Sequence, residues 1–194
     1  MAVLDWIAPD PVTHLQGEGV RLRPPRMADH GEWAELRRRS REFLQPWEPT
    51  WPADDLSRAA FRRRLSIYAR DQELGLGHPF FTFDAAGALV GGVNLRDVRR
   101  GVAQTGALGY WSGAPFARRG HTLAAVRAVR RFAFTRLGLH RLEAACVPEN
   151  AASRALLLRA GFAEEGTARG YLKINGRWRD HLLFGVLRED ADSA

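Results

Sequence analysis

Apolar and polar residues follow two periods along the chain, and together these periods predict a mixed α/β fold. Alternating or aromatic-rich runs predict β-strands at 20–23, 78–84, 88–94, 102–111, 141–147, 162–167 and 178–187. Apolar residues spaced three and four apart predict α-helices at 29–43, about 55–72, 121–137 and 151–160. The long helix between two strands indicates a parallel crossover within the sheet.

Polar and glycine residues mark the ends of these predicted elements. The candidate helix N-caps are Asp29, Asp54 or Asp55, and Asn150. Gly161-Phe162 predicts a helix end with a left-handed glycine followed by an apolar contact. Asn175-Gly176 predicts a tight turn, and three prolines exclude helix and central strand from 44–52.

The length of 194 residues suits one domain. We expect an irregular segment at 1–18, a domain at 19–189 and a short tail at 190–194. Met1–Asp10 lacks the basic flank of a signal peptide, and no apolar run approaches the roughly 20 residues that span a bilayer. A soluble, cytoplasmic protein without membrane contact is therefore expected.

Residue types exclude several classes of site. A single cysteine, Cys146, permits neither an internal disulfide nor a cysteine-based zinc site. The histidines are too far apart for a helical metal motif, so no metal is expected. The only lysine, Lys173, precedes Ile174, which excludes a Walker A loop, and no Gly-x-Ser-x-Gly elbow occurs.

The chain is basic, with a formal net charge of +7, and 29 Lys and Arg residues include only one lysine. An arginine excess suggests binding of phosphate or nucleic acid. A codon bias towards arginine explains the same composition.

Two segments carry candidate chemistry. The loop 117–122 is basic, contains Gly120 and opens the long helix, so its unpaired N–H groups favour an anion such as pyrophosphate. An ordinary turn with solvated arginines is the alternative. In the second segment, Asn150 and Ser153 either face a groove beside the neighbouring strand or belong only to a capped helix.

Together these segments resemble the GNAT superfamily of acetyl-coenzyme A-dependent N-acetyltransferases. The resemblance spans about 20–187 and is greatest to the RimJ-type ribosomal-protein-alanine N-acetyltransferases. The stretches that carry it are Gly91–Leu95, Val98–Gly101, Leu108–Trp111, Leu139–Arg141, Gly161–Gly166 and Tyr171–His181.

The resemblance implies one α/β domain. Its sheet would be mixed but mostly antiparallel, with about six to seven strands splayed at a cofactor cleft and about four flanking helices. Acetyl-CoA would lie between the strands at 108–111 and 142–147. The backbone of Leu108, Gly109, Tyr110 and Trp111 would pair with the pantetheine, and Asn150 and Ser153 would lie near the arm and the sulfur. The implied pyrophosphate contacts are the backbone amides of Arg118, Arg119, Gly120, His121 and Thr122. The adenosine phosphates would meet Arg118, Arg119 or Arg154.

The acceptor side would include the Pro46–Trp51 loop, for which a simply packed loop is the alternative. Trp47, Glu48, Trp51, Asn94 and Tyr171 are the candidate substrate-binding residues. The candidate catalytic residues are Ser153 as proton donor, Tyr110 beside the oxyanion-binding N–H, and Glu48 for the incoming amine.

The sequence departs from the family pattern at Ala117 and Thr122 in the phosphate loop. It also has Ala107 and Leu157 where many members carry an acidic base and a tyrosine acid. No complete acid–base set follows from the resemblance. An enzyme with few acid and base residues is better suited to an α-amine than to a lysine side chain, because about a tenth of an α-amine is already neutral at pH 7.

The predicted function is acetyl transfer to a protein N-terminus, an N-terminal alanine of a small-subunit ribosomal protein. The alternatives are acetylation of a small amine, a basic nucleic-acid-binding module and a CoA-binding regulator without turnover. Nucleic-acid contact is otherwise incidental, and the expected state is monomer or homodimer.

Overall fold

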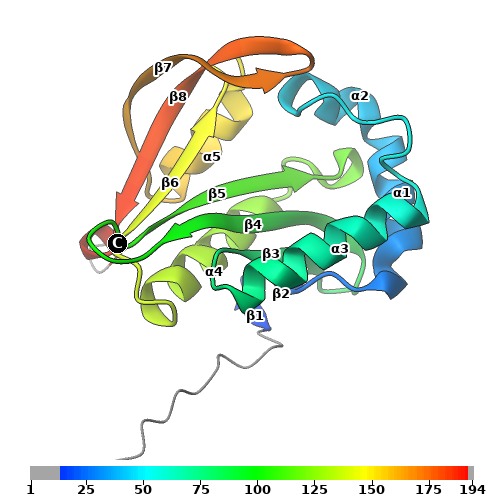
Figure 1. Cartoon of the computed structure of the whole chain (residues 1–194), viewed down its shortest axis with the longest axis horizontal. Helices are drawn as coiled ribbons and strands as arrows, with labels where there is room; N and C mark the ends of the chain where they lie inside the picture. Colours follow the sequence, from blue (N-terminus) through cyan, green and yellow to red (C-terminus); the bar gives the residue numbers. More distant parts are fainter. Residues whose placement is uncertain (1–13, 192–194) are drawn as a thin grey trace, which may run out of the picture.

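One eight-stranded sheet runs through residues 14–191, which are the part of the chain that the computed structural model describes (Figure 1). The strands are β1 (Leu15–Gly17), β2 (Val20–Arg23), β3 (His78–Asp84), β4 (Leu89–Arg99), β5 (Thr105–Ser112), β6 (Arg141–Cys146), β7 (Ala163–Ile174) and β8 (Arg177–Leu187). The helices are α1 (His30–Arg39), α2 (Arg41–Leu44), α3 (Arg58–Glu73), α4 (His121–Thr135) and α5 (Ala151–Arg159). Four 3-10 turns join them: η1 (Met27–Asp29), η2 (Gln45–Trp47), η3 (Ala114–Phe116) and η4 (Glu189–Ala191).

The strand order is β1-β2-β3-β4-β5-β6-β8-β7, and every neighbouring pair is antiparallel except β5 and β6. A parallel pair needs a crossover, and α4 provides it between β5 and β6. The mixed, mostly antiparallel α/β sheet predicted from the sequence is therefore confirmed.

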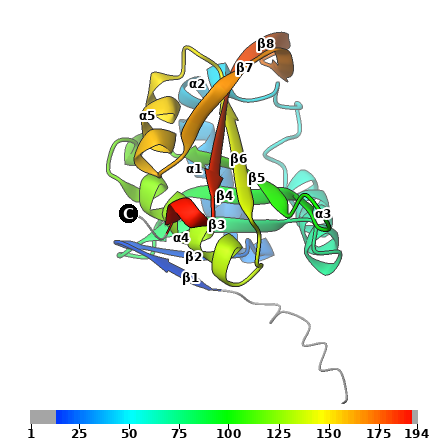
Figure 2. The same ribbon diagram turned by 90° about the vertical axis from the view of Figure 1, so that its left-hand side faces the viewer.

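Two hydrophobic clusters cover opposite faces of this sheet. On one face, α4 buries Ala125, Val126 and Val129 completely, in a cluster that includes Phe80 of β3. On the other face, Trp33 of α1 and Phe61 of α3 pack with residues of β3 that include Phe81. Successive side chains of a strand point to opposite faces, so adjacent phenylalanines serve different clusters. Figure 2 shows α3 and α5 on opposite sides of the sheet.

Several expected boundaries are wrong. Leu15–Gly17, expected to be irregular, form β1 by pairing with β2, and β7 extends to Ile174 rather than to about 167. The first helix ends at Arg39 instead of continuing to about 43, because Ser40 leaves helical geometry and begins α2. The buried Ser40 hydroxyl accepts a hydrogen bond of 2.9 Å from the Ala114 N–H, which fixes this break. The described chain thus has eight strands, one or two more than expected, and five α-helices, one more than expected.

Local capping differs from the prediction at two helices. The Asp29 carboxylate accepts from the Arg26 N–H and pairs with Arg23, so it does not cap α1. Ser57 caps α3 by accepting from the Ala60 N–H at 3.0 Å. Asp54 and Asp55, the expected caps, instead form ion pairs with arginines of α3.

The predicted end of α5 is confirmed. Gly161 has φ of +89°, its N–H binds the Leu158 carbonyl, and the Phe162 N–H binds the Leu157 carbonyl. These two bonds form a Schellman motif, and Phe162 is buried. Asn175-Gly176, both at positive φ, make the turn between β7 and β8. Among residues 14–191, no helix is long and apolar enough to cross a membrane.

Candidate functional site

The site begins where β5 and β6 separate. Their pairing runs from Thr105↔Arg141 to Leu108↔Ala144, but β5 continues to Ser112 and β6 to Cys146. The opposite edge of β5 stays paired with β4 as far as Gly91↔Ser112. Figure 1 shows the two strands diverging. The edge of β5 beyond Leu108 is therefore open to hydrogen bonding by a ligand in extended conformation.

Two helix N-termini lie at this same end of the sheet, because α4 follows β5 and α5 follows β6. Gly120 is the N-cap of α4 and has φ of +85°, a conformation that glycine adopts without strain. In the described chain, the N–H groups of Gly120, His121 and Thr122 have no acceptor, and the His121 Nδ1 is buried without a partner. Such a helix start attracts an anion.

Asn150 caps α5, since its Oδ1 accepts from the Ser153 N–H at 3.0 Å. The prediction that Asn150 caps a helix is therefore confirmed, and its side-chain oxygen is occupied by this bond. No partner within residues 14–191 binds the Asn150 Nδ2, which leaves the N–H donors of this amide for a ligand.

Tyr110 of β5 and Ser153 of α5 meet across the opening, with 2.7 Å between Tyr110 Oη and Ser153 Oγ. Burial raises the pKa of Tyr110, and the hydrogen bond to Ser153 opposes this only in part. The phenol therefore stays protonated at neutral pH. Ser153 also lies against Cys146, whose thiol pKa burial raises. The pair is a neutral proton donor at the point of divergence.

The three arginines expected near phosphate differ in their surroundings. The Arg154 Nε is 2.7 Å from a Glu164 carboxylate oxygen, so its charge is compensated. The Arg119 guanidinium lies 5.8 Å from the Phe116 ring centroid. Arg118 is exposed, and no described residue forms an ion pair with it. Arg118 and Arg119 are thus better placed for an anion than Arg154.

Glu48 is held by two neighbours. Arg37 binds its two carboxylate oxygens at 2.8 and 2.6 Å, and the Trp51 Nε1–H donates to it at 2.7 Å. The Arg37 guanidinium also lies 4.2 Å from the Trp51 ring centroid and 5.2 Å from that of Trp111, on β5. A carboxylate bound this way favours positioning of the loop over proton transfer.

Sequence analysis missed Arg37, although it is buried and joins the loop to β5. Arg37 is the first of three consecutive arginines, a pattern typical of a solvent-exposed helix face. No local signal therefore distinguished it from its exposed neighbours. The Pro46–Trp51 loop is therefore packed through Glu48 and Trp51, while Trp47 is 36% exposed.

The remaining substrate candidates do not gather at one point. Asn94 pairs with Gly109 across β4 and β5, and its Nδ2 donates to Tyr68 at 3.3 Å. Tyr171 is exposed on β7 and lies against His181 with ring centroids 5.6 Å apart. Leu157, at the position of the family tyrosine, is fully buried in the core. Ala107 lies beside Glu143 of β6, a residue engaged with Arg141.

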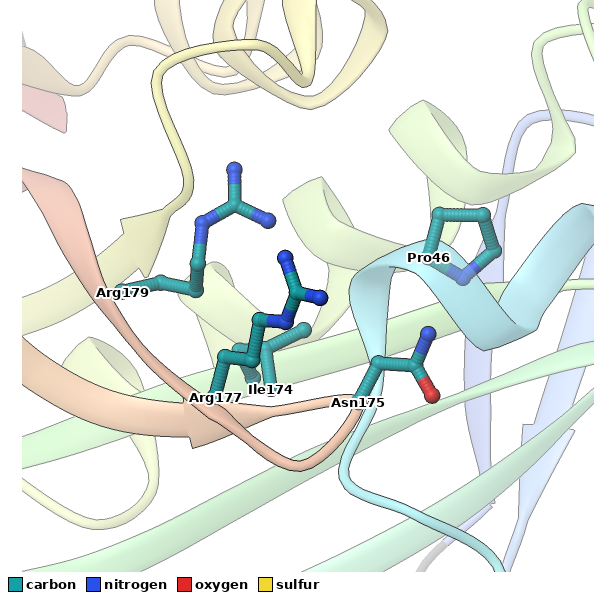
Figure 3. Close-up of a pocket in the computed structure, with 5 residues that line it drawn as sticks. All are labelled: Pro46, Ile174, Asn175, Arg177 and Arg179. Atoms are coloured by element: carbon teal, nitrogen blue, oxygen red, sulfur yellow. The ribbon is translucent and has the colours of Figure 1, made fainter.

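A cavity of about 420 Å³ lies between η2 and the β7–β8 turn (Figure 3). Its lining residues are Pro46, Ile174, Asn175, Arg177 and Arg179. The Asn175 N–H donates to the Glu48 carbonyl at 2.9 Å, so the turn is bonded to the loop. The two arginines lie within the Tyr171–His181 stretch that carries the resemblance, but that stretch gave no reason to place them in a cavity.

Comparison with known proteins agrees with this geometry. The family model of the GNAT acetyltransferase domain matches residues 20–163. The chain belongs to the GNAT acetyltransferase family. It is 34% identical to the "Probable N-acetyltransferase YjcK" of Bacillus subtilis, over 91% of this chain and 98% of that protein. It is 32% identical to the ribosomal protein uS5-alanine N-acetyltransferase of Escherichia coli, over 88% of this chain and 92% of that protein.

The solved structure of Mycobacterium smegmatis RimJ in complex with CoA-disulfide has a TM-score of 0.86 against this chain. The two are 33% identical, over 92% of this chain and 88% of the other. The chain is an acetyl-CoA-dependent N-acetyltransferase of the GNAT and RimJ type. This function replaces two of the alternatives, a nucleic-acid-binding module and a regulator without turnover. No group of three or more metal-ligating side chains was found among the described residues.

The residues at the divergence of β5 and β6 fit acetyl-CoA. The open β5 edge suits an amide-bearing arm, and the free N–H groups at the start of α4 suit a pyrophosphate. Acetyl-CoA supplies the acetyl group as a thioester. Which side chains contact it remains a prediction for each residue named above.

Replacing Gly120 tests the anion-binding helix start. Gly120→Asp puts a negative charge beside the N–H groups of α4, and we expect CoA affinity to fall more than about tenfold. Gly120→Asn is the matched control, because both side chains tolerate the left-handed conformation but only one is charged. Calorimetric affinities that are equal for the two folded variants would contradict the assignment.

Replacing Asn150 separates capping from ligand binding. Asn150→Ala removes the cap of α5, and we expect a loss of about 0.5–2 kcal/mol in the free energy of unfolding and a higher KM for acetyl-CoA. Asn150→Asp retains a cap but lacks the Nδ2 donor, so it should keep its melting temperature and still show the raised KM. A wild-type KM in both variants would leave Asn150 with a structural role only.

Proposed function

We propose that this enzyme acetylates the N-terminal α-amine of a protein, with an N-terminal alanine of a small-subunit ribosomal protein as its acceptor. The observation that carries the proposal is the neutral Tyr110–Ser153 pair at the strand divergence, with no free carboxylate among the candidate catalytic residues. The Escherichia coli relative, named for alanine of ribosomal protein uS5, supports the choice of acceptor.

The free energy of amine deprotonation favours this class of acceptor. Only a neutral amine attacks a thioester. An α-amine with a pKa of about 7.7–8.0 is roughly a tenth neutral at pH 7, whereas a lysine near 10.4 is neutral to about 0.04%. The lysine therefore needs about 3 kcal/mol more deprotonation work. Glu48, fixed by Arg37 and Trp51, offers no free base for that work.

In the proposed reaction, the protein's residues act mainly by positioning. The open edge of β5 near Tyr110 and Trp111 provides a backbone N–H that stabilises the developing oxyanion. The amine nitrogen bonds to the acetyl carbon as the C–S bond breaks. Ser153 Oγ, hydrogen-bonded to the protonated Tyr110, donates a proton to the departing thiolate, and the proton lost by the acylated nitrogen restores the serine hydroxyl. A thiol pKa of about 8.5 makes this donation helpful rather than essential. The Arg37–Glu48–Trp51 network holds the acceptor loop beside β5.

We place the reaction in the cytoplasm, since the proposed acceptor is a ribosomal protein. The working partners are therefore acetyl-CoA and a peptide or protein N-terminus. A monomer or homodimer remains the expected state.

Competition between two peptides tests the proposal. One peptide has a free N-terminal alanine and no lysine, and the other has a blocked N-terminus and one lysine of otherwise matched sequence. With acetyl-CoA, we expect mass spectrometry to find acetylation of the alanine peptide in large excess. Equal acetylation, or a preference for the lysine peptide, would contradict it. Modification of a polyamine or aminoglycoside alone would identify a small-molecule enzyme instead.

A further inference from the structure

The cavity between η2 and the β7–β8 turn is lined by two cationic side chains on one strand. Arg177 and Arg179 are two residues apart on β8, so they extend to the same face, as Figure 3 shows. Pro46 forms the opposite wall, and Ile174 is buried beneath. No acidic residue is among the lining residues that the structure assigns to this cavity.

The charge of the cavity is not balanced. Arg179 pairs with Glu149, with 2.8 Å between the Arg179 Nη2 and the Glu149 Oε1. Arg177 is exposed, and no ion pair or hydrogen bond connects its side chain to any described residue. The nearby Glu48 carboxylate is already neutralised by Arg37. One positive charge therefore remains available beside a partly compensated second one.

Two routes connect this cavity to the proposed transfer site, one through an ion pair and one through a backbone hydrogen bond. Glu149, the partner of Arg179, directly precedes Asn150, the N-cap of α5 that binds the Ser153 N–H. On the other side, Asn175 donates to the Glu48 carbonyl, and Glu48 is bound by Arg37. The cavity thus adjoins the loop that we assign to the acceptor.

We propose that Arg177 and Arg179 recognise a carboxylate side chain of the acceptor peptide, so that the enzyme selects N-termini followed within a few residues by Asp or Glu. The inference rests on the function proposed above. A guanidinium binds a carboxylate with two parallel hydrogen bonds, which gives both affinity and orientation. We take a peptide as the occupant because Pro46, in the loop assigned to the acceptor, forms one wall of the cavity. When the terminal amine of a peptide is near Ser153, the side chains of its following residues can lie in this cavity.

Kinetics with matched peptides test this selection. All peptides begin with alanine and lack lysine. One series carries a single Glu at position 2, 3, 4 or 5, and the matched series carries Gln at the same position. For wild-type protein we expect kcat/KM to be about tenfold higher for the best Glu position, mainly through KM, because a charge-assisted pair is formed. The preference should decrease at high salt.

Variants locate the preference. In Arg177→Gln the ratio of the two kcat/KM values should fall to within about twofold, because the uncompensated cation is lost. Arg177→Glu should favour a peptide with arginine in place of Glu. Arg136→Gln is the matched control, because Arg136 is an exposed arginine at the C-terminal end of α4 and does not line the cavity. This variant should retain the wild-type ratio. Arg179→Gln, which also frees Glu149, should reduce the ratio.

The outcomes separate this inference from the proposed function. Equal kcat/KM for Glu and Gln peptides in wild-type protein would overturn the carboxylate pocket and leave N-terminal acetylation standing. A preference that survives in both Arg177→Gln and Arg179→Gln would overturn the assignment to these residues. Acetylation of neither peptide, or of a phosphate-bearing small amine in their place, would overturn both proposals.

Discussion

The separation of β5 from β6 is the constraint on which the rest of the site depends. These strands are the sheet's parallel pair, so the crossover helix α4 and the following helix α5 begin at the same end of the sheet. Beyond Leu108, the backbone of β5 pairs with β4 and not with β6. Gly91 permits the close approach of these strands, because a Cβ there would collide with the Trp111 carbonyl oxygen. The open strand edge and the two helix N-termini follow from this arrangement.

The acceptor side depends on a different interaction, the ion pair between Arg37 and Glu48. Both side chains are largely buried, and removing one partner of such a pair typically costs about 3–5 kcal/mol because the other charge is left uncompensated. Trp51 and Trp111 enclose the Arg37 guanidinium, so the pair joins the proline-rich loop to β5. The loop in turn bonds to the β7–β8 turn, and the cavity with Arg177 lies between them.

Local sequence signals predicted what is held by local interactions. The apolar face of α4, the Asn150 cap and the Gly161-Phe162 helix end each depend on residues within one or two turns, and all three are confirmed. Features set by distant partners were missed. Ser40 breaks the first helix through Ala114, 74 residues away, and Arg37 is an ordinary helix arginine until Glu48 and two tryptophans surround it. The site residues were named largely from the family resemblance, and their contacts with acetyl-CoA remain predictions.

The central claim, that acetyl-CoA lies in the divergence of β5 and β6 against the start of α4, is most directly tested by amide hydrogen exchange with and without acetyl-CoA. Segments 109–112 and 120–122 have backbone groups open to a ligand, so both should gain strong protection at saturating acetyl-CoA. The far end of α3, near residue 70, should exchange at an unchanged rate. Saturation without protection of either segment, or protection only elsewhere, would contradict the account.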